Sequence, residues 1–350
     1  MKKNLPVILT GVVIGFAALL LTALGNPGNM GFCIACFLRD TAGALGLHSA
    51  GTVQAIRTEI TGIVLGALLI SLFKKEFKPR GGSAPFTRFL LGFIVMVGAL
   101  MFLGCPLRML LRIGGGDLNA VTGLLGFASG IAVGVVVLNK GFSLRRAYPQ
   151  SASEGWAFPV SMALLVIASL VFPALFKLST EGPGSMRAPV IMALAAGLIV
   201  GVMAQRSRLC TMGGIRDAIL FRDFHMLWGA VAIIVTVVLG NLILGKFHLG
   251  FDGQPITHTD GVWNFLGMAL AGWGSVLLGG CPMRQLILAG EGNSDSAVTV
   301  AGLVTGAAIC HNFGLAASPK GPTVNGQIAV AIGFVMLAAI TWFNLQKEAK

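Results

Sequence analysis

The cysteines are the side chains of this sequence whose type and spacing best suit chemistry. A Gly-Cys-Pro turn occurs twice, with Cys105 at 104–106 and Cys281 at 280–282, and each turn closes a long apolar run. Proline lacks a backbone N–H and restricts the residue before it, so each cysteine is expected at a helix break. A thiol is a weak donor on a soft, polarisable sulfur, which suits contact with a large, diffuse atom such as sulfur or selenium.

Two further cysteines recur in the same order, each ahead of an Arg-Asp pair at equal spacing. They are Cys33 before Arg39 and Asp40, and Cys210 before Arg216 and Asp217. We interpret both Arg-Asp pairs as structural charge pairs, because charges within a membrane are usually neutralised by a partner. The alternative is a role at the mouths of a pathway. Arg57 and Glu59 are expected to form another such pair.

An arginine follows each Gly-Cys-Pro turn, Arg108 in the first copy and Arg284 in the second. If a short helix points its amino end at the break, its dipole and free N–H groups favour an anion. Each arginine then either attracts that anion or anchors the short helix at the lipid headgroups, and we expect anchoring.

Cys33 and Cys36 form a Cys-x-x-Cys motif, which is compatible with a redox or metal pair. The second copy has Gly213 in place of Cys36, and neither histidine nor carboxylate lies nearby to complete a zinc site. We therefore predict neither a metal nor a cofactor, and a disulfide framework is not expected in a helical membrane bundle. Cys310, beside His311, is interpreted as a small buried apolar residue.

The composition indicates that membrane helices position these residues. Hydrophobic residues make up 55% of the chain and charged residues 11%, with a mean hydropathy of +0.85. About ten apolar runs approach the ~20 residues that a helix needs to cross a bilayer core. Helices are predicted because lipid offers the backbone no hydrogen-bond partners. The runs are 6–25, 53–73, 86–105, 118–139, 157–177, 187–205, 224–245, 262–280, 297–314 and 326–344.

Charge predicts the orientation of these spans. With the amino terminus inside, most of the 25 basic residues fall on the inside, Lys347 and Lys350 among them. This follows the positive-inside rule with both termini cytoplasmic. It also explains much of the +12 net charge without a nucleic-acid partner, since basic patches interleaved with aromatic residues are absent.

Four segments between the spans are apolar but too short or too interrupted to cross: 29–46, 106–116, 206–221 and 282–292. Irregular backbone at membrane depth survives only where protein or a wet cavity surrounds it, so we predict four short re-entrant helices. The alternative is that they are amphipathic connectors at the interface. The matched cysteines divide the chain into two membrane repeats, 1–177 and 178–350, within one integrated transmembrane domain. Five spans is an odd number, so the second repeat has inverted topology.

These motifs resemble those of the YeeE/YedE family of bacterial inner-membrane sulfur transporters. The resemblance rests on the twin Gly-Cys-Pro turns and on the Phe32-Cys33 and Leu209-Cys210 segments that end in Arg-Asp. It implies an all-helical, hourglass-shaped protein that takes up thiosulfate, with Cys33, Cys105 and Cys281 along the path. Cys210 joins them through the repeat. It also implies a small cytoplasmic sulfur-carrier protein as a partner.

The sequence therefore predicts a transporter, not an enzyme, for a small sulfur-containing or selenium-containing anion, with thiosulfate first. Within the family the chain is more similar to the branch of selenium transporters, and composition does not separate the two substrates. A rival is a membrane-bound sulfurtransferase or thiol redox enzyme that uses Cys33 and Cys36. An ATP-binding loop is absent from the sequence. Coupled transport, channel-like conduction and the oligomeric state stay open.

Overall fold

The computed structural model describes residues 4–345, and the regular secondary structure there is almost entirely helical. Lys2, Lys3, Lys347 and Lys350, which enter the predicted charge distribution, lie outside the described residues. Ten long helices are present within 4–345: α1 (Leu5–Ala23), α3 (Thr58–Phe73), α4 (Pro85–Met101), α6 (Leu118–Asn139), α7 (Ala152–Val171), α8 (Val190–Ser207), α10 (Leu227–Ile243), α11 (Gly261–Leu278), α13 (Ser294–Asn312) and α14 (Val324–Asn344).

The remaining elements are short. Four helices of nine to eleven residues stand between the long ones: α2 (Ile34–Ala44), α5 (Pro106–Gly114), α9 (Thr211–Phe221) and α12 (Pro282–Gly290). A 3-10 turn, η1 (Pro173–Leu175), follows α7. Two strands, β1 (Arg80–Gly81) and β2 (Tyr148–Pro149), pair antiparallel at one end of the molecule.

The all-helical prediction is confirmed, and each of the ten predicted spans overlaps a long helix. Seven helical segments within 4–345 are long and apolar enough to cross a membrane, and α3 and α10 are shorter apolar helices. Helix α13 falls outside both groups, since serine, threonine, asparagine and histidine lower its hydropathy. Polar residues begin several of these helices by accepting a backbone N–H, as Asp117 does for α6 and Asp260 for α11.

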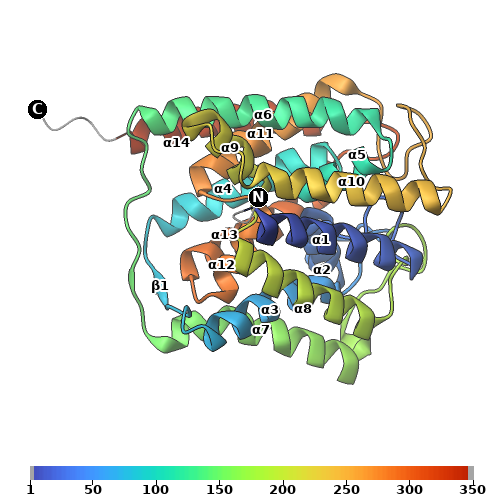
Figure 1. Cartoon of the computed structure of the whole chain (residues 1–350), viewed down its shortest axis with the longest axis horizontal. Coiled ribbons are helices and arrows are strands. Elements are labelled where there is room, and N and C mark those ends of the chain that lie inside the picture. Colours follow the sequence, from blue (N-terminus) through green and yellow to red (C-terminus); the bar gives the residue numbers. More distant parts are fainter. Residues whose placement is uncertain (1–3, 346–350) are drawn as a thin grey trace, which may run out of the picture.

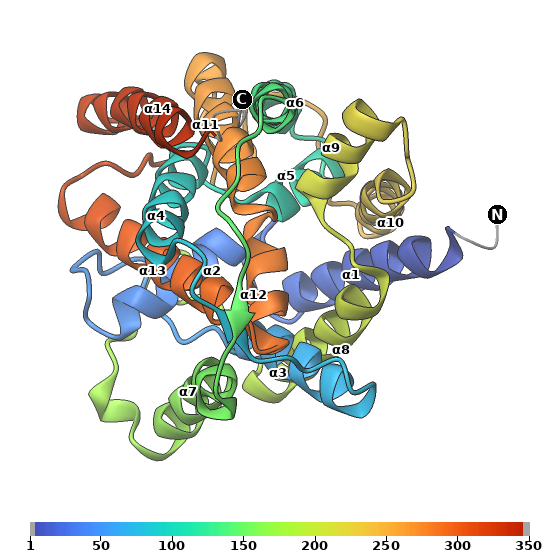
Figure 2. The same ribbon diagram turned by 90° about the vertical axis from the view of Figure 1, so that its left-hand side faces the viewer.

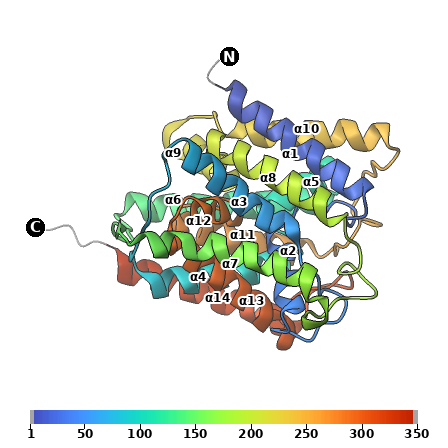
Figure 3. The same ribbon diagram turned by 90° about the horizontal axis from the view of Figure 1, so that it is seen from below.

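The long helices run side by side, and the short helices lie among them (Figure 1). Seen from the end of the bundle, α12 lies near the centre (Figure 2), where it packs on α3 and α13. Figure 3 shows α7, α3, α8, α1 and α10 as successive neighbours along one side. Figure 1 places α2 and α5 to the right of centre and α9 and α12 to the left.

The packing follows a pattern when α1–α6 are matched in order with α8–α13. Helix α3 packs on α8 as α10 packs on α1, and α4 packs on α13 as α11 packs on α6. The short helices follow the same rule, because α5 packs on α10 and α12 packs on α3. Helices α7 and α14 do not, since α7 packs on α3, α12 and α13, whereas α14 packs on α4 and α11. The fifth helices of the two predicted repeats, α7 and α14, therefore pack differently in the two halves.

Glycines allow the paired helices to approach closely, as is common in membranes. Gly11 and Gly15 of α1 lie against the carbonyl groups of Gly229 and Ile233 in α10. Gly197 and Gly201 of α8 lie in the same way against the carbonyl groups of Glu59 and Ile63 in α3. This correspondence aligns Glu59 with Gly229. Exposed leucine, isoleucine, valine and phenylalanine side chains cover the outer faces of the bundle, as contact with lipid requires.

Candidate functional site

Each of the four short helices begins directly after a cysteine. The N-cap residues are Cys33 for α2, Cys105 for α5, Cys210 for α9 and Cys281 for α12, all with extended backbone. Pro106 and Pro282 occupy the first helical position, where the fixed proline backbone starts a helix and its missing N–H costs nothing. The prolines thus begin α5 and α12 as well as ending the helices before them.

The first thiol centre, which we define as Cys33, Cys36 and Cys105, joins the amino ends of α2 and α5. The Ile34 N–H at the start of α2 donates to Cys105 Sγ at 3.2 Å, and the Cys36 N–H donates to Cys33 Sγ at 3.3 Å. The Cys36 thiol donates to the Leu103 carbonyl oxygen at 3.8 Å. Two helix amino ends therefore converge on three sulfur atoms, which favours negative charge at this point.

The second thiol centre, Cys210 and Cys281, joins α9 and α12 in a related way. Cys210 Sγ accepts both from the Gly213 N–H and from the Cys281 N–H, each at 3.4 Å. In the first centre the bridging acceptor is the cysteine of the Gly-Cys-Pro turn, and in the second it is the other cysteine. Both centres therefore join two cysteine-capped helices, but the cysteine that accepts the bridging N–H is exchanged between them.

Arg108 is held at the first centre by several hydrogen bonds. It is fully buried and donates to carbonyl groups of Leu103, Asn29 at 3.2 Å and Ile256 at 3.1 Å. Its Nη1 also lies 3.8 Å from Cys36 Sγ. The expected role as a headgroup anchor is wrong for Arg108, because its guanidinium is enclosed by protein.

Arg284, the counterpart in the second centre, is held much less tightly. Its Nη1 lies 3.4 Å from Glu291 Oε1, which also faces Arg208 at 3.5 Å, and within the described residues that nitrogen has no hydrogen-bond acceptor. The Arg284 side chain is 11% exposed. Arg284 is thus the arginine of the pair that is available to a ligand.

A second group of charged residues lies near Arg284, just outside the apolar segments. Glu76, in the loop after α3, accepts from Gln205 at 2.7 Å and from Arg206 at 3.0 Å. These two hydrogen bonds lower the pKa of Glu76 below its usual value. Arg208 also contacts Glu76, at 3.3 Å, and so connects it to Glu291.

The predicted Arg-Asp pairs form, with one addition and one correction. Arg39 contacts Asp40 at 2.7 Å, and Arg57 contacts the other carboxylate oxygen at 2.8 Å. The expected pairing of Arg57 with Glu59 is wrong, because Arg57 is committed to Asp40. Both Asp40 and its arginines are buried. The second pair, Arg216 with Asp217 at 2.8 Å, is partly exposed.

One buried ion pair had no counterpart in the sequence prediction. Arg112 of α5 contacts Asp117, the N-cap of α6, at 2.5 Å, and its guanidinium carbon lies 4.1 Å from the Phe102 ring centroid. Both charged side chains are fully buried. The only sequence signal was an aspartate shortly after an arginine in a short apolar segment, which alone does not establish a contact.

The region of the first centre carries excess positive charge. Asp40 is shared between two arginines, and Arg108 has no acidic partner within 4.0 Å among residues 4–345. A cavity of about 280 Å³ adjoins this region and is lined by Leu103, Arg39 and His311 among others. An anion entering that cavity meets buried positive charge that water screens little.

Two other predictions concern Cys310 and metal binding. Cys310 is buried in the core, as expected, and its neighbour His311 stacks on His48 with ring centroids 4.8 Å apart. Within the described residues there is no group of three or more histidine, cysteine, aspartate or glutamate side chains placed to hold a metal ion.

Comparison with known proteins relates part of the chain to sulfur transport. The family model described as "Sulphur transport" matches residues 206–346. Residues 206–346, which make up less than half of the chain, are therefore similar to sulfur-transport proteins, as the resemblance to the YeeE/YedE family predicts. Two relatives are named Thiosulfate transporter TsuA: the Escherichia coli (strain K12) protein is 29% identical over 107 residues, and the Spirochaeta thermophila protein is 30% identical over 100 residues.

The similarity covers only part of this chain and only part of its relatives. Each alignment spans 29% of the relative's length, and 29% and 28% of this chain respectively. The family segment contains the whole second thiol centre with Arg284 and Glu291. The first thiol centre lies outside it, so its assignment depends on the matched geometry of the two centres.

Proposed function

We propose that this protein is a membrane transporter that takes up a small sulfur-containing anion, thiosulfate first, through the two thiol centres. The observation that carries the proposal is that four short helices, each capped by a cysteine, meet in two pairs within an apolar bundle. Soft sulfur contacts and helix amino ends together suit an anion with a terminal sulfur. The names of the two relatives support thiosulfate as its identity.

The path is formed by two inverted repeats, 1–177 and 178–350, whose short helices re-enter the membrane from opposite sides in an hourglass arrangement. The matched packing of α1–α6 with α8–α13 supports this, as does the separation of α2 and α5 from α9 and α12 in Figure 1. The basic loops at the end with β1 and β2 favour a cytoplasmic position for that end and for both termini. The first thiol centre then faces outward and the second faces the cytoplasm, across the bacterial inner membrane.

The structure corresponds to a closed state of this path. Cys33, Cys36, Cys105, Cys210 and Cys281 are each 5% exposed or less. An anion passes only if the short helices move. Thiosulfate is a dianion, and bringing it inward against a potential of roughly 100 mV costs about 5 kcal/mol. Uptake therefore requires a gradient, or removal of the cargo by a cytoplasmic sulfur-carrier protein.

Uptake of radiolabelled thiosulfate into proteoliposomes tests the proposal, with selenite and sulfate as competitors. Cys105→Ala and Cys281→Ala are each expected to lower uptake at least tenfold, because each removes a sulfur from one centre. Cys310→Ala is the comparison variant, because Cys310 is a buried cysteine in neither centre but lines the cavity beside the first centre. It is expected to lower uptake much less than either of the other two changes. Correctly folded wild type that takes up none of these anions would overturn the proposal.

The competitors separate thiosulfate from a selenium species, which suits the same thiol contacts. If selenite competes and sulfate does not, the substrate class includes selenium oxyanions. If neither competes, the terminal sulfur of thiosulfate decides recognition.

The three sulfur atoms of the first centre favour a thiol redox or sulfurtransferase enzyme as a second candidate function. Cys36 is the discriminating residue, since Gly213 replaces it in the second centre. Cys36→Ala abolishes the activity of a redox pair, whereas a transport path tolerates it. An enzyme also turns over in detergent, where a transporter shows no net flux.

A further inference from the structure

Glu59 differs from every other buried carboxylate within residues 4–345. Four others are buried, and each lies within 4.0 Å of at least one arginine: Asp40 with Arg39 and Arg57, Asp117 with Arg112, Asp295 with Arg88, and Glu291 with Arg284 and Arg208. Glu59 is 2% exposed and has no such partner among these residues. A carboxylate within an apolar helix that lacks a counter-charge is costly to keep ionised.

Asn26 is the polar partner of Glu59. The Asn26 Nδ2 donates to Glu59 Oε1 at 2.8 Å and to the Gly31 carbonyl oxygen at 3.1 Å. The Asn26 Oδ1 accepts from the Ala188 N–H at 2.9 Å, which fixes the orientation of the amide. Gly31 lies two residues before Cys33, so Asn26 connects the Glu59 carboxyl group to the backbone that leads into the first thiol centre.

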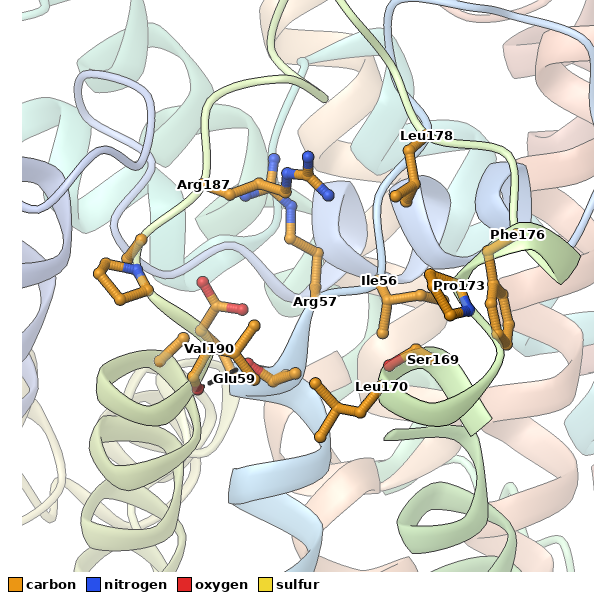
Figure 4. A pocket seen from close by; sticks show the side chains of 14 residues that line it. Ile56, Arg57, Glu59, Ser169, Leu170, Pro173, Phe176, Leu178, Arg187 and Val190 are labelled. Carbon is orange, nitrogen blue, oxygen red and sulfur yellow. Dashed lines mark hydrogen bonds between the residues drawn. The ribbon is translucent and has the colours of Figure 1, made fainter. Parts of the chain in front are cut away.

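Glu59 also borders a cavity. Its volume is about 320 Å³, and it lies between the start of α3, the end of α7 and the segment before α8. Figure 4 shows Arg57, Glu59 and Arg187 among the side chains around it. Water in a cavity of this size brings protons to the carboxyl group.

The charged groups around Glu59 do not fix its ionisation. Arg57 faces it from its own helix but is committed to Asp40 on α2, whose negative charge opposes a second one nearby. Arg187 lines the cavity from the segment before α8, and the α7 and α8 residues lining it are uncharged. The first-turn position in α3 and the Asn26 amide favour the carboxylate, whereas burial favours the acid. Both forms are therefore accessible.

The fold itself does not require an acid at this position. In the matched contact between α1 and α10, the residue that takes the place of Glu59 is Gly229. The two halves share the close helix approach, but only the first half carries the carboxyl group.

We propose that Glu59 is a proton-binding site that opens to the outer side and controls anion uptake. Binding of a proton removes a negative charge from beside the excess positive charge of the first thiol centre, and so strengthens the attraction for an incoming anion. The carboxylate takes the proton from water in the cavity and returns it there when the anion has left. This inference rests on the proposed function for its link to transport, but the proton site itself does not.

Two measurements test it. Thiosulfate uptake by wild-type proteoliposomes is expected to be several-fold faster at an external pH of about 6 than at about 8, at constant internal pH. Glu59→Gln is expected to remove that dependence. In parallel, infrared spectra of the full-length protein in detergent are expected to show a protonated carboxyl absorbance in wild type that Glu59→Gln removes. Asp295→Asn, the same change at a carboxylate that faces Arg88, should leave that absorbance in place.

Several outcomes would overturn the inference. The first is a protonated carboxyl absorbance that persists in Glu59→Gln. The second is a wild-type pH dependence of uptake in that variant, and the third is uptake that follows external sodium at constant pH. If wild type takes up no thiosulfate, the proposed function fails, and the infrared comparison alone decides whether Glu59 binds a proton. If Glu59→Gln does not fold, Glu59→Asp replaces it, and a proton site predicts a shifted midpoint for the absorbance, whereas an unchanged titration would reject it.

Discussion

The two arginines that follow the Gly-Cys-Pro turns illustrate how matched residues acquire different roles. Arg108 donates to carbonyl groups from three separate segments, so its guanidinium holds loops around the first centre while its positive charge has no acidic partner there. Arg284 faces only Glu291 among the carboxylates of the described chain. We therefore assign a structural role to Arg108 and an anion-contacting role to Arg284.

Replacing each arginine by glutamine separates these roles. Arg108→Gln leaves several buried carbonyl groups without a donor, at about 1–3 kcal/mol each, so we expect a large loss of stability in thermal unfolding of the detergent-solubilised protein. Arg284→Gln is expected to fold normally and to lower thiosulfate uptake roughly tenfold or more, as loss of a charge-assisted contact does. The reverse pattern, with a stable Arg108→Gln and an unstable Arg284→Gln, would contradict the assignment.

At the scale of elements, close helix contacts hold the two halves together. Gly130 of α6 lies directly against the Ala269 carbonyl group of α11, and a methyl group there would overlap it. Gly130→Ala is expected to destabilise the protein by about 1–3 kcal/mol, because the two helices must separate. Gly51→Ala is the control, since a methyl group at Gly51 has open space around it. Equal unfolding temperatures for the two variants would show that this contact does not limit stability.

The helices were predictable from sequence because apolar length and proline positions are local signals. Helix α6 has the predicted bounds of 118–139, and all four short helices lie within their predicted segments. The positions of Cys105 and Cys281 at N-caps follow from the prolines after them, whereas Cys33 and Cys210 have no such signal. The partners of charged residues were less predictable: Arg57 contacts Asp40 on another helix, and Glu59 is bonded to Asn26 in a loop. Such contacts depend on packing between distant segments, which spacing along the chain does not encode.

At the scale of the whole molecule, the two halves are alike in backbone and unlike in charge. The first half encloses fully buried ion pairs, whereas the Arg216–Asp217 pair and Arg208 of the second half are partly exposed. In the proposed orientation, enclosed positive charge at the first thiol centre and more exposed charges at the second suit an anion that binds from outside and is released inside. This interpretation depends on the orientation of the chain, which is directly testable.

Labelling of single introduced cysteines tests the orientation. Ser153 lies in the first turn of α7 and Thr180 lies beyond its carboxyl end, and both are exposed. The native cysteines within the described residues are all buried. We expect a membrane-impermeant maleimide to label Thr180→Cys from outside a spheroplast, and to label Ser153→Cys only after permeabilisation. Wild type is the control for background reaction. Labelling of both variants from the same side would mean that α7 does not cross the membrane, which would remove the odd number of spans per half on which the inverted repeat depends.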